Sequence, residues 1–211
     1  MLANLYMNRL LKGWRKTKRG ERFDAHIVNY ADDFVILSRS KAAEALNWTR
    51  QVVTRMGVTL NEAKTSIKQA RQESFNFLGY TFGPHRYKKD GHWYLGASPS
   101  KKAVARIKEK VGQLLVPRNT GTWEEARNRL NQILRGWSAY FSYGTRAAAY
   151  DAVDNYVYES VRHFLRRRHQ VQSRGTNRFS IQTVFGELVV LQLSRAKVVA
   201  HSCPVKNCAR N

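Results

Sequence analysis

The spacing of apolar residues predicts alternating helices and strands over the first part of the chain. Residues 2–16 place apolar side chains near one helical face, which predicts an amphipathic helix. Two short apolar runs, 25–30 and 34–37, lie on either side of an acidic pair. Such a pattern indicates a tight β-hairpin with the acids at its turn. Ser40 is then expected to cap a helix that runs to about Met56.

Later apolar runs add more strands before a helical pattern returns. Extended segments are expected at 58–60, 66–70, 75–82 and 93–96. Together with the helices before them, these short strands predict an α+β fold with helices packed on a mainly antiparallel sheet.

The helical pattern dominates from residue 98 onward. Ser98 and Pro99 are the residue types of a helix cap and a first helical position. Thr122 and Glu125 delimit a capping-box sequence, and the apolar spacing predicts a third helix over 146–169. The segment 181–193 fits a strand or a helix. The sequence therefore predicts three domains, at residues 1–97, 98–169 and 170–211.

The charge of the chain points to a polyanionic partner. The 211 residues have a formal net charge of +22, from 37 Lys and Arg against 15 Asp and Glu. Nucleic acid is the usual partner of such a chain, and an anionic membrane surface is the alternative. No apolar run is long enough to span a bilayer, and no signal-peptide pattern is present. Only two cysteines occur, so we expect a cytoplasmic protein without a disulfide framework.

The acidic pair Asp32 and Asp33 is the first candidate for chemistry. Hard cations take oxygen ligands, and Mg²⁺ is usually held by one or two carboxylates together with substrate phosphates. Two carboxylates at one hairpin tip therefore make a candidate Mg²⁺ site. Aspartates are also common in solvated turns that bind nothing, so the pattern alone leaves both interpretations open.

Four segments carry a resemblance to a known family. Residues 29–35, Asn-Tyr-Ala-Asp-Asp-Phe-Val, resemble the catalytic hairpin of reverse transcriptases, in the form carried by bacterial group II intron-encoded proteins. Residues 57–65 resemble the next palm motif, 77–80 the primer grip, and 134–141 the motif of the thumb, or maturase (X) domain. They follow the family's order, and the resemblance covers nearly the whole chain, fading after about residue 178. It implies part of a polymerase palm followed by a three-helix thumb.

The resemblance also implies roles for individual residues in catalysis. Asp32 would be the metal ligand on the hairpin with Asp33 beside it, and Mg²⁺ would be the cofactor. Lys64 would protonate the leaving pyrophosphate or steady the incoming dNTP. The ordinary alternative for Lys64 is a solvated lysine among many.

Nucleic-acid contacts are implied at further positions. Phe77, Leu78, Gly79 and Tyr80 would position the primer end, although the same run fits a plain core strand with a bulge. On the thumb, Arg135 and Gly136 are better contact candidates than the aromatic residues that follow, most of which fit the helix core. The remaining candidates are Tyr30 beside the acidic pair and the basic cluster Arg166, Arg167 and Arg168, which also fits a solvated helix end.

The first catalytic carboxylate of the family has no evident counterpart. Phe23 and Asp24 match its Phe-Asp pair only superficially, since Asp24 lies eight residues before Asp32 in one extended segment. At about 3.3 Å per residue, the two carboxylates would lie roughly 26 Å apart. Residues 1–8 resemble the helix after the family's template-contacting motif, so we expect the chain to begin inside the fingers–palm region and to be inactive alone.

The sequence thus predicts part of an RNA-directed DNA polymerase of group II intron type, with a maturase role. The expected partners are an RNA template, an RNA/DNA duplex and the intron RNA. The alternatives are a non-catalytic RNA-binding maturase module, a decayed mobile-element remnant, or a relative that serves defence or diversity generation. His201, Cys203 and Cys208 supply only three of the four ligands of a structural zinc site.

Overall fold

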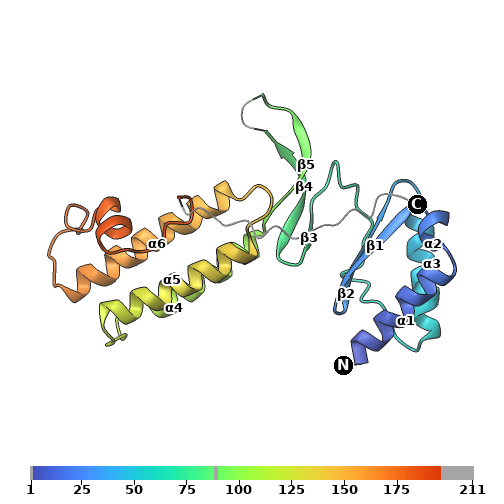
Figure 1. The fold of residues 1–211 in the computed structure, drawn as a ribbon, viewed down its shortest axis with the longest axis horizontal. Helices are drawn as coiled ribbons and strands as arrows, with labels where there is room; N and C mark the ends of the chain where they lie inside the picture. The colour runs from blue at the N-terminus through green and yellow to red at the C-terminus, as the bar shows by residue number, and fades with distance from the viewer. Residues whose placement is uncertain (1, 88–89, 196–211) are drawn as a thin grey trace. The chain divides into compact units, whose positions relative to one another are not determined.

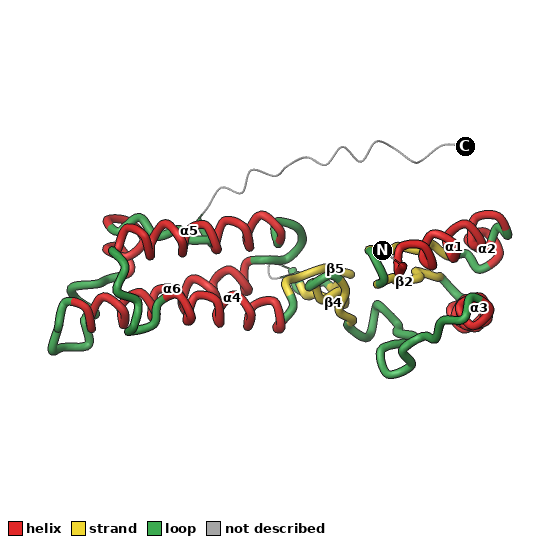
Figure 2. Tube along the Cα trace, turned by 90° about the horizontal axis from the view of Figure 1, so that it is seen from below, coloured by secondary structure: helices red, strands yellow, loops and turns green. Residues whose placement is uncertain are grey.

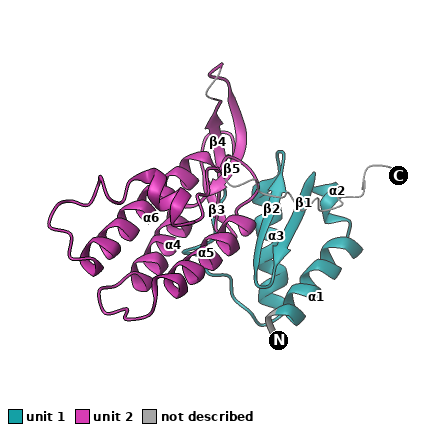
Figure 3. Ribbon diagram, turned by 60° about the vertical axis from the view of Figure 1, so that its left-hand side comes forward, with its two compact units in different colours: residues 1–69 teal, residues 70–211 magenta. Residues whose placement is uncertain are grey.

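The computed structural model describes residues 2–87 and 90–195. The chain divides into two compact units, residues 1–69 and 70–211 (Figure 3). Each unit mixes helices with an antiparallel sheet, which confirms the predicted α+β class. No helix within the described ranges is long and apolar enough to cross a membrane. The cluster His201, Cys203 and Cys208 lies outside the described residues.

The first unit is a β-hairpin with helices on one face. Its elements are α1 (Leu2–Lys16), α2 (Arg19–Arg22), β1 (Ala25–Tyr30), β2 (Asp33–Ser38) and α3 (Ala42–Arg55). The two strands pair antiparallel from Ala25↔Ser38 at the open end to Tyr30↔Asp33 at the tip.

Two small hydrophobic clusters hold the first unit together. Trp14 of α1 packs edge-on against Trp48 of α3 at a ring distance of 5.4 Å. Ile27 on the inner face of β1 contacts both clusters. The helix spacing of the apolar residues in α1 and α3 therefore creates the face that covers the hairpin.

Three local predictions for the first unit were wrong. The cap of α3 is Lys41 rather than Ser40, because Ser38 Oγ accepts the Lys41 backbone N–H at 3.1 Å. Residues 58–60 and 66–70 do not form strands in the structure. A strand needs a neighbouring strand to pair with. The segment between α3 and β3 is instead held by side chains, since Arg50 of α3 donates two hydrogen bonds to Glu62, at 3.0 and 2.7 Å.

The second unit begins with a three-stranded sheet in the order β3-β4-β5. The strands are β3 (Phe75–Phe77), β4 (Tyr80–Arg86) and β5 (Trp93–Pro99). Three helices follow, α4 (Lys101–Leu114), α5 (Trp123–Tyr140) and α6 (Ala147–Arg168), and then a short π-helix, η1 (Thr183–Glu187). Within this unit α5 forms one layer, and α4 and α6 form the other (Figure 2).

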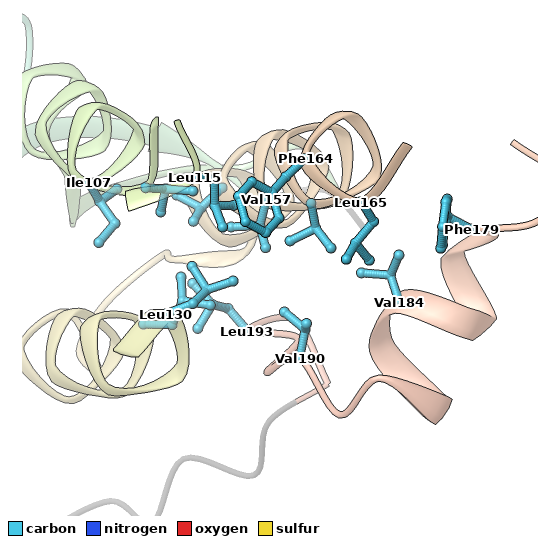
Figure 4. Packing of buried hydrophobic residues seen from close by; sticks show 14 of the residues in the cluster. Ile107, Leu115, Leu130, Val157, Phe164, Leu165, Phe179, Val184, Val190 and Leu193 are labelled. Atoms are coloured by element: carbon cyan, nitrogen blue, oxygen red, sulfur yellow. The ribbon is translucent and has the colours of Figure 1, made fainter. Parts of the chain in front are cut away.

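One large hydrophobic core joins the three helices to the segment after α6 (Figure 4). The predicted inward positions of α6 are all buried, among them Val153, Val157 and Val161. Leu130 and Leu134 of α5 face them from the other layer. Residues after α6 complete this core, at Phe179, Val184, Val190 and Leu193.

The predicted helix starts agree with the structure for α5 but not for α4. The capping box of α5 is confirmed: Glu125 N–H donates to Thr122 Oγ1 at 3.2 Å, and Thr122 N–H donates to Glu125 Oε2 at 2.9 Å. The predicted start of α4 was wrong by two residues. Strand β5 extends to Pro99, and Ser100 caps the helix by accepting the Ala103 N–H at 3.1 Å.

Residues 188–195, which we call the C-terminal strap, run back along α5 and α6 without regular structure. Buried Asn131 of α5 donates to Val189 O at 2.9 Å and accepts the Leu191 N–H at 2.8 Å. Buried Asp154 of α6 accepts the Leu193 and Ser194 backbone N–H groups at 2.8 and 2.9 Å. The side chains of Asn131 and Asp154 thus supply hydrogen-bond partners for backbone N–H and C=O groups of a segment that does not pair with a strand.

Candidate nucleic-acid interface and metal-binding hairpin

The predicted acidic hairpin is present, with the two aspartates at its tip. Ala31 and Asp32 form a two-residue turn between β1 and β2, and Ala31 has a left-handed φ of 53°. Asp33 is the first residue of β2 and lies opposite Tyr30. Both carboxylates are exposed, and neither has a hydrogen-bond or ion-pair partner among the described residues. Their oxygens are therefore free to bind a hard cation.

The hairpin keeps Asp24 away from this tip. Asp24 precedes the open end of β1, where its carboxylate lies 3.9 Å from the Arg39 guanidinium. The six residues of β1 separate it from the turn, which is roughly 20 Å at 3.3 Å per residue. The described residues contain no group of three or more His, Cys, Asp or Glu that could hold a metal ion. The tip thus offers two carboxylates, and Asp24 does not supply a third.

The outer face of the same hairpin exposes apolar side chains. Tyr30 is 65% exposed, and Val28 and Leu37 lie on its face of the sheet. The opposite face packs on α1 and α3 through Ile27 and Phe34. Tyr30 therefore lies beside the acidic tip with its ring available to a ligand.

Lys64 lies in a turn of the segment that connects α3 to β3 in the sequence. Its backbone N–H donates to Asn61 O at 3.0 Å, and Thr65 Oγ1 donates to the same carbonyl at 2.9 Å. The neighbouring Arg50–Glu62 hydrogen bond raises the pKa of Arg50 and lowers the pKa of Glu62. The Lys64 side chain is exposed, and within the described ranges no hydrogen bond or ion pair joins it to the acidic tip.

The segment that resembles the primer grip is a hairpin turn rather than a bulged strand. Leu78 and Gly79 both have positive φ, 51° and 78°, and Phe77 pairs with Tyr80 across them. A turn with two left-handed residues matches the twist of an antiparallel pair and favours glycine. A Cβ added at Gly79 would lie 3.2 Å from the Phe141 ring, so glycine also permits close packing here.

Two tyrosines fasten this turn to the end of α5. Tyr80 donates its hydroxyl hydrogen to Tyr140 O at 2.7 Å, and Tyr140 donates to Leu78 O at 2.8 Å. Burial raises the pKa of Tyr80. The apolar stripe of α5 suggested core positions here, yet Tyr140 is 54% exposed while Phe141 is buried. Tyr140 is the site residue that sequence reasoning missed, because only the folded turn shows its hydroxyl partner.

Arg135 and Gly136 lie on the solvent side of α5. Both are exposed, and open space surrounds the Gly136 Cα. The Arg135 guanidinium makes no hydrogen bond or ion pair with any described residue. The neighbouring Leu134 is fully buried, which fixes the orientation of this face. An unpaired guanidinium beside accessible backbone suits contact with a phosphate.

The three arginines of the basic cluster at the end of α6 differ in their contacts. Arg168 donates to the backbone carbonyls of Thr120 and Gly121 and lies over the Phe164 ring. Arg166 is half-buried, whereas Arg167 and Arg168 are exposed and both line a recess of about 160 Å³, with only Arg168 engaged by these carbonyls. Arg167 is therefore the member of the cluster best placed to meet a ligand, and Arg168 also holds the loop before α5.

Comparison with known families agrees with this arrangement. Residues 1–82 match the reverse transcriptase (RNA-dependent DNA polymerase) family, and residues 104–180 match the group II intron, maturase-specific domain. The chain belongs to the group II intron reverse transcriptase/maturase family. A search of curated proteins gave no match.

The reverse transcriptase match contains the acidic hairpin, Lys64 and the turn at Leu78 and Gly79. The maturase-specific match contains Arg135, Gly136 and the arginine cluster. These two domains imply nucleic-acid partners, and the reverse transcriptase family implies dependence on a divalent metal ion in general. The Tyr80–Tyr140 contact links a residue of one match to a residue of the other.

Proposed function

We propose that this reverse transcriptase/maturase chain binds intron RNA and template–primer duplexes through the solvent face of its thumb helices. The observation that carries the proposal is the exposed, unpaired Arg135 beside the open backbone of Gly136. A net charge of +22 supplies the wider electrostatic attraction. In this proposal residues 1–97 form the palm part, 98–169 the thumb and 170–211 an extension, and the chain is cytoplasmic.

The test of RNA binding compares two arginines of α5. Arg135→Ala should weaken binding of a structured intron RNA and reduce the slope of log K against log salt by about 1, the effect of one lost phosphate contact. Arg129→Ala is the matched control, because the Arg129 guanidinium already donates to Gln132 at 2.8 Å. Arg129 lies six positions before Arg135, which places it about 120° around the helix from Arg135. Equal slopes for both variants would contradict the proposal.

We further propose that Asp32 and Asp33 hold Mg²⁺ for nucleotidyl transfer. When bound, the metal would activate the attacking primer hydroxyl and stabilise the leaving pyrophosphate. Lys64 would donate a proton to that pyrophosphate or bind the triphosphate of a dNTP. The turn formed by Leu78 and Gly79, fixed by Tyr140, would position the primer end.

Metal binding can be tested apart from activity. Mn²⁺ serves as a paramagnetic probe of the same oxygen ligands, and its binding to the full chain with a nucleotide is measured by electron paramagnetic resonance. Asp32→Asn with Asp33→Asn should abolish the bound signal. Asp24→Asn is the control at the far end of the hairpin and should leave it unchanged. An unchanged signal in the double variant would refute the metal assignment.

A non-catalytic RNA-binding role is the second candidate. It is favoured by the absence of a third metal-ligating side chain near the tip within the described residues. On this ground the purified chain should bind RNA yet fail to extend a primer with Mg²⁺. Mg²⁺-dependent cDNA synthesis by the purified chain would contradict it.

A further inference from the structure

The β4–β5 hairpin projects beyond the helices of the second unit (Figures 1 and 3). Its base is fixed, because Thr145 N–H donates to Ala97 O at 2.7 Å and Tyr94 Oη lies 2.6 Å from Thr145 Oγ1. Beyond that base, the side chains of Arg86, Trp93 and Leu95 are exposed. The hairpin is thus anchored at its base, and these three side chains are accessible to solvent.

One face of this hairpin exposes two large apolar side chains. Trp93 is 68% exposed and Leu95 is 58% exposed, and the strand register places both on the face of Arg86 and Pro84. Trp93 is the most exposed of the large apolar residues in the described part of the chain. An indole left in water on a projecting element indicates a binding surface more often than a scattered exposed side chain does.

Aromatic contacts on the opposite face stabilise the hairpin that carries Trp93. Its aromatic rings contact one another in series, with centroid distances of 5.2 Å for Tyr87–His92, 6.0 Å for His92–Tyr94 and 5.9 Å for His85–Tyr94. Cross-strand aromatic pairs stabilise a two-stranded ribbon. Trp93 is therefore presented on an ordered strand, which lowers the entropic cost of binding.

The charge of the hairpin indicates which partner fits. Residues 80–99 contain three Lys or Arg and one Asp, and the carboxylate of that Asp90 is already engaged by His92 at 2.6 Å. An aromatic ring on a basic hairpin suits a strand that carries both phosphates and accessible base faces. Bases inside a duplex are stacked on one another, so an unpaired strand fits better than a duplex.

We propose that the β4–β5 hairpin is a stacking site for unpaired RNA bases, with the Trp93 indole as its platform. This inference rests on the proposed binding of RNA by the chain, but it assigns a site separate from Arg135. It predicts affinity that depends on bases rather than on phosphates alone. A protein partner on this face is the alternative, and it predicts no such dependence.

The experiment measures fluorescence anisotropy of labelled oligouridylate with the full chain. Trp93→Ala should weaken binding about tenfold, the effect of losing one base–aromatic stack. Trp93→Phe should retain most of the affinity, because a ring remains. Ile181→Ala is the matched control, since Ile181 is 55% exposed in the same unit but outside the hairpin. The thermal unfolding of each variant checks that the fold is intact, as expected for exposed positions.

Two further probes separate the possible outcomes. An abasic strand of equal length should bind the wild type and Trp93→Ala equally, and so should a duplex RNA. If Trp93→Ala binds oligouridylate like the wild type, the stacking site is refuted while RNA binding by the chain stands. An equal loss on all three probes would also overturn it, since stacking requires a base. If the wild type binds no RNA, the proposed function fails as well.

Discussion

The contact between Asp154 and the C-terminal strap allows a quantitative prediction for Asp154→Ala. The buried carboxylate accepts the Leu193 N–H at 2.8 Å, the Ser194 N–H at 2.9 Å and the Ser194 hydroxyl at 2.7 Å. Alanine leaves the two backbone N–H groups without their acceptor. Each unsatisfied buried donor costs about 1–3 kcal/mol, so the variant should lower the free energy of unfolding by about 2–6 kcal/mol. Asp154→Asn keeps one acceptor oxygen and should lose about half as much.

Two measurements check this expectation. Urea unfolding followed by far-UV circular dichroism reports the stability of the helical unit, and hydrogen exchange reports whether residues 188–195 detach. Asp151→Asn is the matched control, because Asp151 is exposed one turn earlier on α6 and has no partner among the described residues. If Asp154→Ala unfolds at the same urea concentration as the control, the strap does not contribute to the stability of the core.

Three further variants test the packing of the second unit. Gly79→Ala places a Cβ 3.2 Å from the Phe141 ring at a φ of 78° and should cost about 1–3 kcal/mol in thermal unfolding; an unchanged melting temperature would be inconsistent with this geometry. Tyr140→Phe removes the hydrogen bond to Leu78 and should cost about 0.5–1.5 kcal/mol, with faster amide exchange in the turn as the specific sign. Burial raises the pKa of Tyr150 above its usual 10.0, so the folded state holds this proton more tightly than the unfolded state. Stability should therefore fall as pH rises above about 10, and Tyr150→Phe should show a smaller fall in alkaline urea titrations.

Local signals in the sequence were sufficient for the elements that depend on near neighbours. The α5 capping box joins residues three apart, and the inward stripe of α6 follows helical spacing, so both could be predicted. The start of α4 could not, because the pairing of Pro99 with Tyr80 extends β5 over the residues that look like a cap. Pairing between distant strands overrides a local cap signal in this case.

The site shows the same division between local and distant contacts. The acidic turn is local, so the sequence predicts a hairpin with Asp32 and Asp33 at its turn, and the structure adds that both carboxylates are exposed. The hydroxyl of Tyr140 reaches a carbonyl 62 residues away, and Asp154 binds backbone 39 and 40 residues away. No periodicity or spacing in the sequence encodes such partners, so only the folded chain reveals them.

The unequal size of the two units' hydrophobic cores affects how ligands would act on the β1–β2 hairpin. Among the residues that the structure describes, two clusters with four and three buried residues hold the first unit, whereas fifteen buried residues form the core of the second. Regions with few buried apolar contacts open locally at a lower free energy than the rest of a protein. A ligand that binds only the closed hairpin, at a hundred times its Kd, would oppose that opening by about 2.7 kcal/mol. A metal ion or nucleic acid bound at Asp32 and Asp33 would thus raise the population of the ordered first unit as well as occupy its hairpin tip.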